Sequence, residues 1–282
     1  MSVGFCDLNL RPPNKADVRN LCSAAKNAGY SVVAVSTEVD VNVFAKKGKK
    51  GDANAIIPPP MDLTALQKEF EGKLKILQRL TVQISDNLQA YKVSQSSTAM
   101  EYDILAVQPL NPQAFQHACS VMEVDIVSFD ASDCAPLKAA RKVVRQAGER
   151  GIYFEAQYSP LIASSATRRN AITLAHALHA VGRGKCNLVL TSGAAASTFL
   201  RSPYDVANFS MLLGLSEESA KNCMKQAART VLLNAQARKI GRGMVFGSLS
   251  RPVEDKLAEE NGVPPSKKRK ADDDASEVTV IN

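Results

Sequence analysis

IYFEAQYSPLIASSATRRNAITLAHALHAVGRGKCNLVLTS, residues 152–192, contains two short apolar segments with one long amphipathic segment between them. The first segment, residues 152–159, and the last, residues 187–192, have the length and composition of β-strands. The central segment, residues 164–184, has apolar residues at helical spacing and ends in glycine. A strand, a helix and a second strand in this order predict two parallel strands joined by a crossover helix.

The same alternation extends over most of the chain. Five further strands are predicted, at residues 3–10, 31–37, 74–85, 103–110 and 124–130, and helical segments lie between most of them. Because no GxGxxG motif follows the first strand, a closed barrel is favoured over a doubly wound dinucleotide-binding sheet. We therefore predict an α/β fold: a distorted TIM-like (β/α) barrel of about seven parallel strands. Residues 243–249 are a candidate for an eighth strand.

Two segments depart from this pattern. Residues 42–72 carry KKGKKGD and IPPP before a short helix that begins near Asp62, so we expect a surface insertion within a barrel domain of residues 1–248. Residues 249–282 are polar and charged, which predicts a disordered tail. Two prolines precede SKKRK in this tail and three aspartates follow it, a pattern typical of a nuclear-import signal rather than of a solvated charge run. The signal would consist of Lys267, Lys268, Arg269 and Lys270.

The chain is basic, and its charge is unevenly placed. Lys and Arg number 35 against 28 Asp and Glu, a net charge of +7. Residues 249–282 hold six basic and eight acidic side chains, a charge of −2, which leaves +9 on residues 1–248. A basic body favours a polyanionic partner, because contacts with phosphates release condensed counterions. No apolar run is long enough to span a bilayer, so we expect no membrane contact.

The six cysteines lie at positions 6, 22, 119, 134, 186 and 223 and form no CxxC pair. Neither a zinc-binding nor a redox motif is visible. The N-terminus does not resemble a signal peptide, so we expect reduced thiols in an intracellular protein.

The end of the first predicted strand argues against a metal-dependent hydrolase. A metal-dependent phosphoesterase barrel is expected to present histidines there, at alternate positions, but this chain has Asn9 and Arg11. Asparagine is a poor ligand for transition metals, and a guanidinium is never deprotonated in proteins. Walker, GxSxG and HExxH motifs are also absent from the sequence. We therefore predict no metal, no other cofactor and no catalytic residue.

One alternative keeps an enzymatic function. Three acidic residues lie near predicted strand or helix ends: Asp7, Glu155 and Asp205. A barrel phosphoesterase could bind its metal through these remaining carboxylates.

Arginines occur where predicted strands end or helices begin. Arg168 and Arg169 lie near the start of the helix that follows the sixth strand, and Arg201 precedes the helix after the seventh. All three are predicted at the C-terminal face of the barrel. Because arginine matches phosphate geometry with two parallel hydrogen bonds, RNA or partner contact is favoured over internal ion pairs. For Arg79, on the polar side of the third strand, the two alternatives are evenly balanced.

The segment RSPYDVAN, residues 201–208, has the pattern of a helix start. Ser202 is the predicted N-cap, Pro203 occupies the first helical position and Asp205 lies three residues after the cap. Tyr204 and Asn208 are not explained by this pattern. They are candidates for stacking on RNA or hydrogen-bonding it, with packing of the loop against the barrel as an equal alternative.

Several segments in the same order resemble one family, the TIM-barrel protein subunit of ribonuclease P and ribonuclease MRP, known as the thirty-kilodalton subunit. The most specific is RSPYDVANFSMLLGLSEESAK. The others are FCDLNLRPPN, GYSVVAVS, LKILQRLTVQISD, YDILAVQP, VDIVSFD, FEAQYSP, TRRNAI and ARTVLLNAQAR.

This resemblance implies a barrel related to the polymerase and histidinol phosphatase superfamily, without that superfamily's metal-binding histidines. It also implies a non-catalytic role, in which the RNA subunit cleaves the 5′ leader of precursor tRNA and this protein supports the RNA. The partners would be the ribonuclease P or MRP RNA, other protein subunits and, indirectly, precursor tRNA; the MRP particle processes precursor rRNA. The implied location is the nucleus and nucleolus. A protein-only adaptor, in which the arginines bind acidic partner surfaces, is the remaining alternative.

Overall fold

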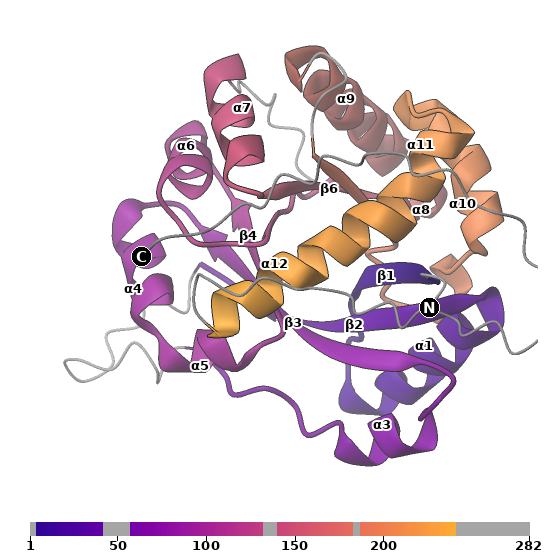
Figure 1. Ribbon diagram of the computed structural model, residues 1–282. Helices are drawn as coiled ribbons and strands as arrows, with labels where there is room; N and C mark the ends of the chain where they lie inside the picture. Colours follow the sequence, from indigo (N-terminus) through magenta and orange to yellow (C-terminus); the bar gives the residue numbers. More distant parts are fainter. Residues whose placement is uncertain (1–3, 42–56, 132–139, 183–186, 241–282) are drawn as a thin grey trace, which may run out of the picture. The chain divides into compact units, whose positions relative to one another are not determined.

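The sheet has seven parallel strands, as the sequence predicts, in a computed structural model that describes residues 4–41, 57–131, 140–182 and 187–240 (Figure 1). The strands follow one another around the sheet in chain order: β1 (Phe5–Leu10), β2 (Tyr30–Val39), β3 (Lys75–Ile84), β4 (Ile104–Pro109), β5 (Ile126–Val127), β6 (Tyr153–Gln157) and β7 (Leu188–Thr191). The predicted strand at residues 124–130 pairs only over the two residues of β5.

The last strand returns to the first, so the barrel is nearly closed. Leu10 of β1 forms a parallel bridge with Ala194, just beyond β7, and the Arg11 N–H donates to the Ala194 carbonyl over 2.9 Å. The Asp7 carboxylate accepts a hydrogen bond from the Ser192 N–H over 2.9 Å. A backbone bridge and a side chain therefore connect β1 to the end of β7.

Helices cover the outside of the sheet and one end of the barrel. They are α1 (Lys15–Ala28), α3 (Thr64–Glu69), α4 (Asn87–Gln95), α5 (Ser97–Glu101), α6 (Pro112–Ser120), α7 (Arg141–Glu149), α8 (Ser159–Ala163), α9 (Ser165–Gly182), α10 (Pro203–Phe209), α11 (Glu217–Asn222) and α12 (Ala228–Ile240). Short 3-10 segments, η2 (Ser197–Phe199) and η3 (Ser210–Leu213), and a π-helical turn, η4 (Cys223–Ala227), lie between the last of them.

The core has two parts because successive side chains of a strand point to opposite faces of the sheet. The larger part lies between the sheet and the outer helices. The smaller part fills the N-terminal half of the barrel interior, where Ala228 and Val231 of α12 pack against apolar strand residues. These strand residues are Cys6, Leu8, Ala34, Ile104, Ala106, Ile126 and Val189. Figure 1 shows α12 lying across the strands that it covers.

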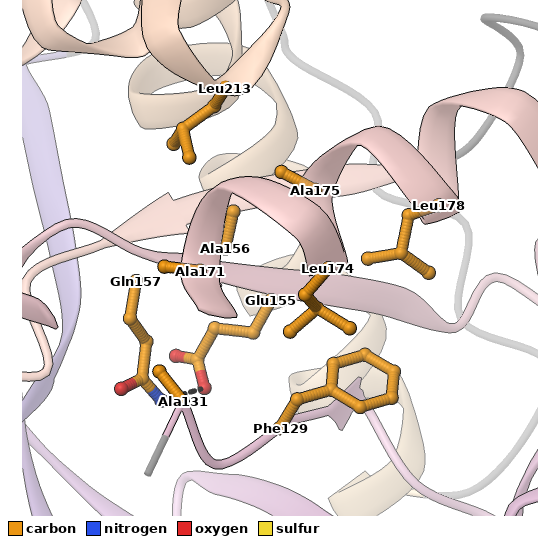
Figure 2. Close-up of a pocket in the computed structure, with 10 residues that line it drawn as sticks. All are labelled: Phe129, Ala131, Glu155, Ala156, Gln157, Ala171, Leu174, Ala175, Leu178 and Leu213. Atoms are coloured by element: carbon orange, nitrogen blue, oxygen red, sulfur yellow. Dashed lines mark hydrogen bonds between the residues drawn. The ribbon is translucent and has the colours of Figure 1, made fainter. Parts of the chain in front are cut away.

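Under α9, the outer layer leaves a small pocket against β6 (Figure 2). Its walls are mostly apolar, with Leu174 and Leu178 from α9, Phe129 from the loop after β5 and Leu213 from η3. Glu155, Gln157 and several alanines complete the lining, and the small alanines of β6 and α9 let the helix approach the sheet closely. The pocket therefore lies within the packing of α9 and offers few polar groups to a ligand.

The described second half of the predicted surface insertion at residues 42–72 is mostly exposed, but three of its side chains join the core. Ile57, Leu63 and Phe70 are buried in the larger core, and the Tyr102 hydroxyl donates to the Pro58 carbonyl over 3.0 Å. These apolar side chains flank α3 and pack against the sheet. The prolines and charged residues around them in the sequence do not predict this burial.

Several predictions lie outside the described residues: the first half of that insertion, the possible strand at residues 243–249, the tail at residues 249–282 and its basic signal at 266–270. Within the described ranges, no helix is long and apolar enough to cross a membrane. The four described cysteines, Cys6, Cys22, Cys119 and Cys223, are buried and form no disulfide with one another.

Candidate functional site

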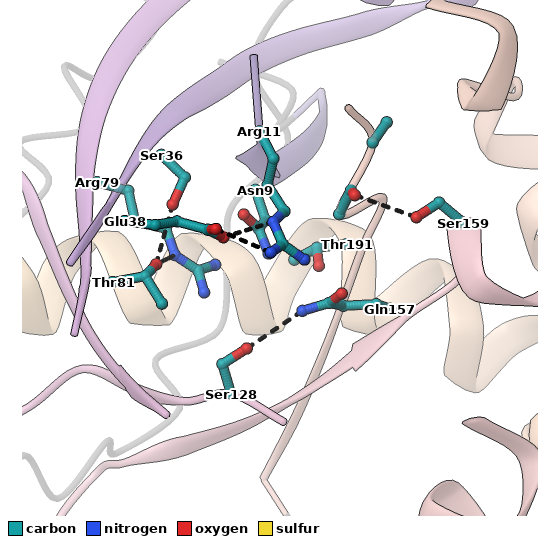
Figure 3. Close-up of polar contacts among 12 residues, drawn as sticks. Asn9, Arg11, Ser36, Glu38, Arg79, Thr81, Ser128, Gln157, Ser159 and Thr191 are labelled. Carbon is teal, nitrogen blue, oxygen red and sulfur yellow. Dashed lines mark hydrogen bonds and ion pairs between the residues drawn. The ribbon is translucent and has the colours of Figure 1, made fainter. Parts of the chain in front are cut away.

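The barrel interior changes from apolar to polar towards the C-terminal ends of the strands, the end at which TIM-barrel enzymes hold their catalytic groups. Figure 3 shows the side chains that gather there. They alternate along the strands with residues of the outer core, and they include Asn9, Arg11, Ser36, Glu38, Arg79, Thr81, Ser128, Gln157 and Thr191.

A fully buried ion pair crosses this polar layer. Arg79 of β3 donates from Nη1 to Glu155 Oε1 over 2.5 Å and from Nη2 to Oε2 over 2.8 Å. Further Arg79 hydrogen bonds reach Thr81 Oγ1 and the Leu8 carbonyl, both over 3.0 Å. Because β3 and β6 are three strands apart in the sheet, the pair must span the interior. The guanidinium and carboxylate therefore fill the middle of the barrel.

Both members of the pair carry charge. Burial alone would raise the pKa of Glu155, but the Arg79 charge and the hydrogen bonds from Arg79, Ser128 and Thr191 outweigh it and lower the pKa to about 2. The possibility that Arg79 contacts RNA is wrong in this structure, since its side chain is 0% exposed. The structure instead shows the internal ion pair, which was the other alternative for Arg79.

The rim of the barrel holds a second ion pair, between Arg11 and Glu38. The Arg11 Nη2 donates to Glu38 Oε2 over 2.8 Å, and the two side chains are 36% and 42% exposed. Arg11 thus binds a carboxylate of the neighbouring strand at a position where a metal-dependent barrel enzyme would carry a ligand.

The three carboxylates of the phosphoesterase alternative lie in three different settings. Glu155 is held by Arg79, and Asp205 is exposed and accepts from the Ser202 hydroxyl over 2.8 Å. Asp7 lies at the junction of β1 and β7, where its Oδ1 accepts from the Ser192 N–H. Burial raises the pKa of Asp7, and its Oδ2 atom has no hydrogen-bond partner. In the part of the chain that the structure describes, no three His, Cys, Asp or Glu side chains gather closely enough to hold a metal ion.

Arg168 and Arg169 are exposed together in the first turns of α9. The Arg168 Nε donates to the Leu161 carbonyl over 2.6 Å, which leaves the rest of its guanidinium at the surface. Arg201 is only half-exposed, and its Nη1 donates to the Thr198 and Leu200 carbonyls, both over 2.7 Å. Arg168 and Arg169 thus share one surface, whereas the Arg201 guanidinium binds backbone carbonyls of the segment just before it. Contact of these residues with RNA or a partner stays a prediction.

The helix start at α10 is confirmed. Ser202 Oγ accepts from the Asp205 N–H over 3.2 Å, and Pro203 occupies the first helical position. Tyr204 is 62% exposed, and its ring meets Phe5 edge to face, with centroids 5.5 Å apart. Asn208, one turn further along α10, is exposed. Tyr204 therefore packs against the barrel along one edge and presents most of its ring to solvent; RNA contact by Tyr204 or Asn208 stays a prediction.

Sequence reasoning missed most of the polar layer, including its two longest omitted side chains, Glu38 and Gln157. Glu38 lies two residues after Ser36, and Gln157 two after Glu155, so the alternation of strand side chains could have placed both in the interior. Gln157 donates to Ser128 Oγ over 3.2 Å. Their partners lie on other strands, which the sequence pattern does not specify.

The fold and this site together define a class: a parallel α/β barrel in which ion pairs between strands, Arg79–Glu155 and Arg11–Glu38, lie at the C-terminal end of the interior. The chain belongs to the ribonuclease P subunit p30 family, whose model matches residues 4–240.

Individual relatives agree with this assignment. The mouse (Mus musculus) ribonuclease P protein subunit p30 is 32% identical over 273 residues, which cover 96% of this chain and 99% of the mouse protein. The ribonuclease P/MRP protein subunit RPP1 of Saccharomyces cerevisiae is 22% identical over 239 residues, 82% of this chain and 80% of the yeast protein. A chain in the structure of archaeal ribonuclease P with mature tRNA has a similar fold, with a TM-score of 0.62 and 14% identity over 88% of this chain and 99% of the archaeal one.

Proposed function

We propose that this chain is a non-catalytic protein subunit of ribonuclease P, in which the RNA subunit removes the 5′ leader of precursor tRNA. The observation that carries the proposal is the match of nearly the whole described barrel to the subunit p30 family. The site geometry supports the non-catalytic part, because Arg79 and Glu155 are bound to each other where a barrel enzyme would hold reacting groups. The chain would support the RNA and bind other protein subunits of the particle.

We extend the proposal to ribonuclease MRP, precursor rRNA processing and a nuclear and nucleolar location. The yeast relative's name, which includes both enzymes, supports the first extension. The basic run at residues 267–270 supports import into the nucleus. A fluorescent fusion in which these four residues are alanine should lose its nuclear accumulation; unchanged accumulation would contradict the assignment of the signal.

Affinity capture of the tagged chain from cell extract tests the main proposal. The captured RNA is sequenced, and the eluate is assayed for cleavage of precursor tRNA before and after nuclease treatment. We expect enrichment of a ribonuclease P or MRP RNA and loss of cleavage after the nuclease. A complex that contains no RNA and survives the nuclease would indicate a protein-only adaptor. Cleavage of a phosphodiester by the purified chain alone would indicate an enzyme.

A further inference from the structure

Helices α7 and α9 form a basic surface beside the barrel. Each follows a parallel strand and returns antiparallel to it, so both begin at the C-terminal end of the barrel, and they pack against each other. Val144 and Ala147 lie on the buried face of α7. Arg141, Lys142 and Arg145 lie on its exposed face.

The charge of this surface is strongly one-sided. Residues 141–182 contain six basic side chains and two acidic ones. One acidic residue, Glu155, is buried against Arg79, and the other, Glu149, forms an exposed ion pair with Arg145 over 3.1 Å. The sixth basic residue, Arg150, donates to backbone carbonyls of residues 119–122. Five basic side chains therefore lie on two adjoining helices: Arg141, Lys142, Arg145, Arg168 and Arg169.

The surface lacks the features of a protein interface. Stable protein interfaces centre on buried aromatic or large apolar anchors. None of the large apolar side chains that are exposed in the described residues lies on α7 or α9; they are Leu88, Tyr91, Leu110, Val121, Tyr204, Met211, Leu212 and Ile240. Arginine and lysine on an otherwise polar surface instead suit phosphates, which they bind through charge-assisted hydrogen bonds.

We propose that the five basic residues of this α7–α9 surface bind the phosphate backbone of the RNA subunit directly. The inference rests on the proposed function and adds to it the surface and the chemical group recognised. Packed helices lie roughly 8–10 Å apart, so two basic rows at that separation would contact several phosphates of one RNA segment. The ion pair between Arg145 and Glu149 does not prevent phosphate binding. Their side chains are 79% and 65% exposed, so a phosphate can replace the carboxylate as the partner of Arg145.

The test compares two triple variants that remove equal charge. R141Q/K142Q/R145Q changes the α7 row. K15Q/R19Q/K68Q changes three exposed basic residues of α1 and α3, and Arg19 is ion-paired with Glu69 as Arg145 is with Glu149. Each tagged chain is captured from cell extract with its particle, and the ribonuclease P RNA and protein subunits retained are measured at increasing salt. Circular dichroism checks that both variants fold and melt like the wild type.

We expect the α7 variant to lose its RNA at lower salt than the wild type, with about tenfold less RNA retained at 0.3 M salt, and the control to change less than twofold. Each phosphate contact removed should lower the salt slope of RNA binding by roughly 0.7–0.9. R168Q/R169Q should act in the same direction. Equal RNA retention by the α7 variant and the control would overturn the proposal. Loss of a protein subunit from the nuclease-treated α7 variant would instead assign the surface to an acidic protein. Failure of the wild type to capture the RNA would contradict the proposed function itself.

Discussion

At the scale of single residues, the Arg79–Glu155 pair is the most consequential feature of the barrel interior. Taking two charges out of water costs several kcal/mol each, and only close mutual contact with further hydrogen bonds offsets that cost. Here Thr191 Oγ1 also donates to Glu155 Oε1 over 2.8 Å, and Thr81 Oγ1 accepts from Arg79 Nε. The pair therefore adds little net stability, but each buried charge needs the other as its counterion.

Substitution of one member should cost more than substitution of both. Glu155→Gln leaves the Arg79 cation buried without a counterion and should lower the unfolding free energy by about 3–5 kcal/mol, measured by urea denaturation at pH 7. The double variant R79M/E155M should be more stable than Glu155→Gln alone. Glu69→Gln, which breaks the exposed pair with Arg19, serves as the control and should cost less than about 1 kcal/mol. A Glu155→Gln protein as stable as this control would show that the interior ion pair does not form.

The same pair gives the stability a pH dependence. The pKa of Glu155 is lowered from 4.5 to about 2, so its contribution is fully present above pH 4.5 and is lost as the pH falls towards 2. In Glu155→Gln, the unfolding free energy should fall less steeply than in the wild type over that range. Parallel curves for the two proteins between pH 4.5 and 2 would contradict this assignment.

At the scale of elements, α12 covers the N-terminal end of the barrel, and polar contacts at its C-terminal end hold it there. Arg238 Nη2 donates to Asp125 Oδ2 over 2.9 Å, and both side chains are less than 10% exposed. The same carboxylate oxygen accepts from the Leu105 N–H over 2.8 Å. Asn234 donates to the Gly151 carbonyl over 3.1 Å. The helix thus joins the starts of several strands as well as filling the interior with Ala228 and Val231.

Arg238→Ala should detach this end of α12. Burial raises the pKa of Asp125 against the opposing effect of Arg238, so removal of the arginine leaves a costly buried carboxylate. We expect a loss of about 3–5 kcal/mol in unfolding free energy at pH 7. The loss should shrink at lower pH, because the folded state then binds a proton at Asp125 more readily than the unfolded chain does.

The neighbouring substitution Lys239→Ala is a matched control for this prediction. Lys239 pairs with Asp103 over 2.9 Å at the same end of α12, but its side chain is 28% exposed and that of Asp103 36%. It should cost less than about 1 kcal/mol in unfolding free energy. Similar losses in the two variants, measured by thermal and urea denaturation, would mean that burial of the Asp125 pair is not what holds the helix.

At the scale of the whole molecule, neighbouring strands of the described barrel share the fewest backbone pairs where the barrel closes. Strands β2 and β3 pair along eight residues of each, whereas β1 and the end of β7 share one bridge, between Leu10 and Ala194. The Asp7 carboxylate accounts for part of the difference, because it accepts the Ser192 N–H that a further backbone carbonyl would otherwise take. The closure therefore depends on a buried acidic side chain whose pKa is raised by its surroundings.

Native-state hydrogen exchange should reveal this difference. The amides of Arg11 and Ser192 should exchange through openings of lower free energy than those of Val82 and Val107 in the middle of the sheet. Asp7→Ala should speed exchange at Ser192 further, because it removes the acceptor, while Asp7→Asn, which keeps an acceptor oxygen, should change it less. Uniform exchange across these four amides in the wild type would show that the barrel opens as one cooperative unit.

The order of strands and helices could be predicted because its signals are local. Spacing of apolar residues sets the strand and helix segments, and Ser202 and Pro203 mark the start of α10 within a few residues of chain. The short β5 and the burial of Ile57 and Phe70 could not be predicted in the same way. Strand length depends on which neighbours pair, and burial of Ile57 and Phe70 depends on a core contributed by distant elements.

For this protein, the sequence by itself determined the parallel barrel, the missing histidines at the first strand and the basic charge of the body. Only the tertiary structure decided that Arg79 faces a carboxylate rather than phosphate, and that α7, the helix of Arg141, Lys142 and Arg145, packs against α9, the helix of Arg168 and Arg169. Glu155 is 76 residues from Arg79 along the chain. The two side chains meet only because the sheet curves into a barrel. In the same way, the apolar spacing of a helix predicts which face is buried but not which neighbouring helix packs against it.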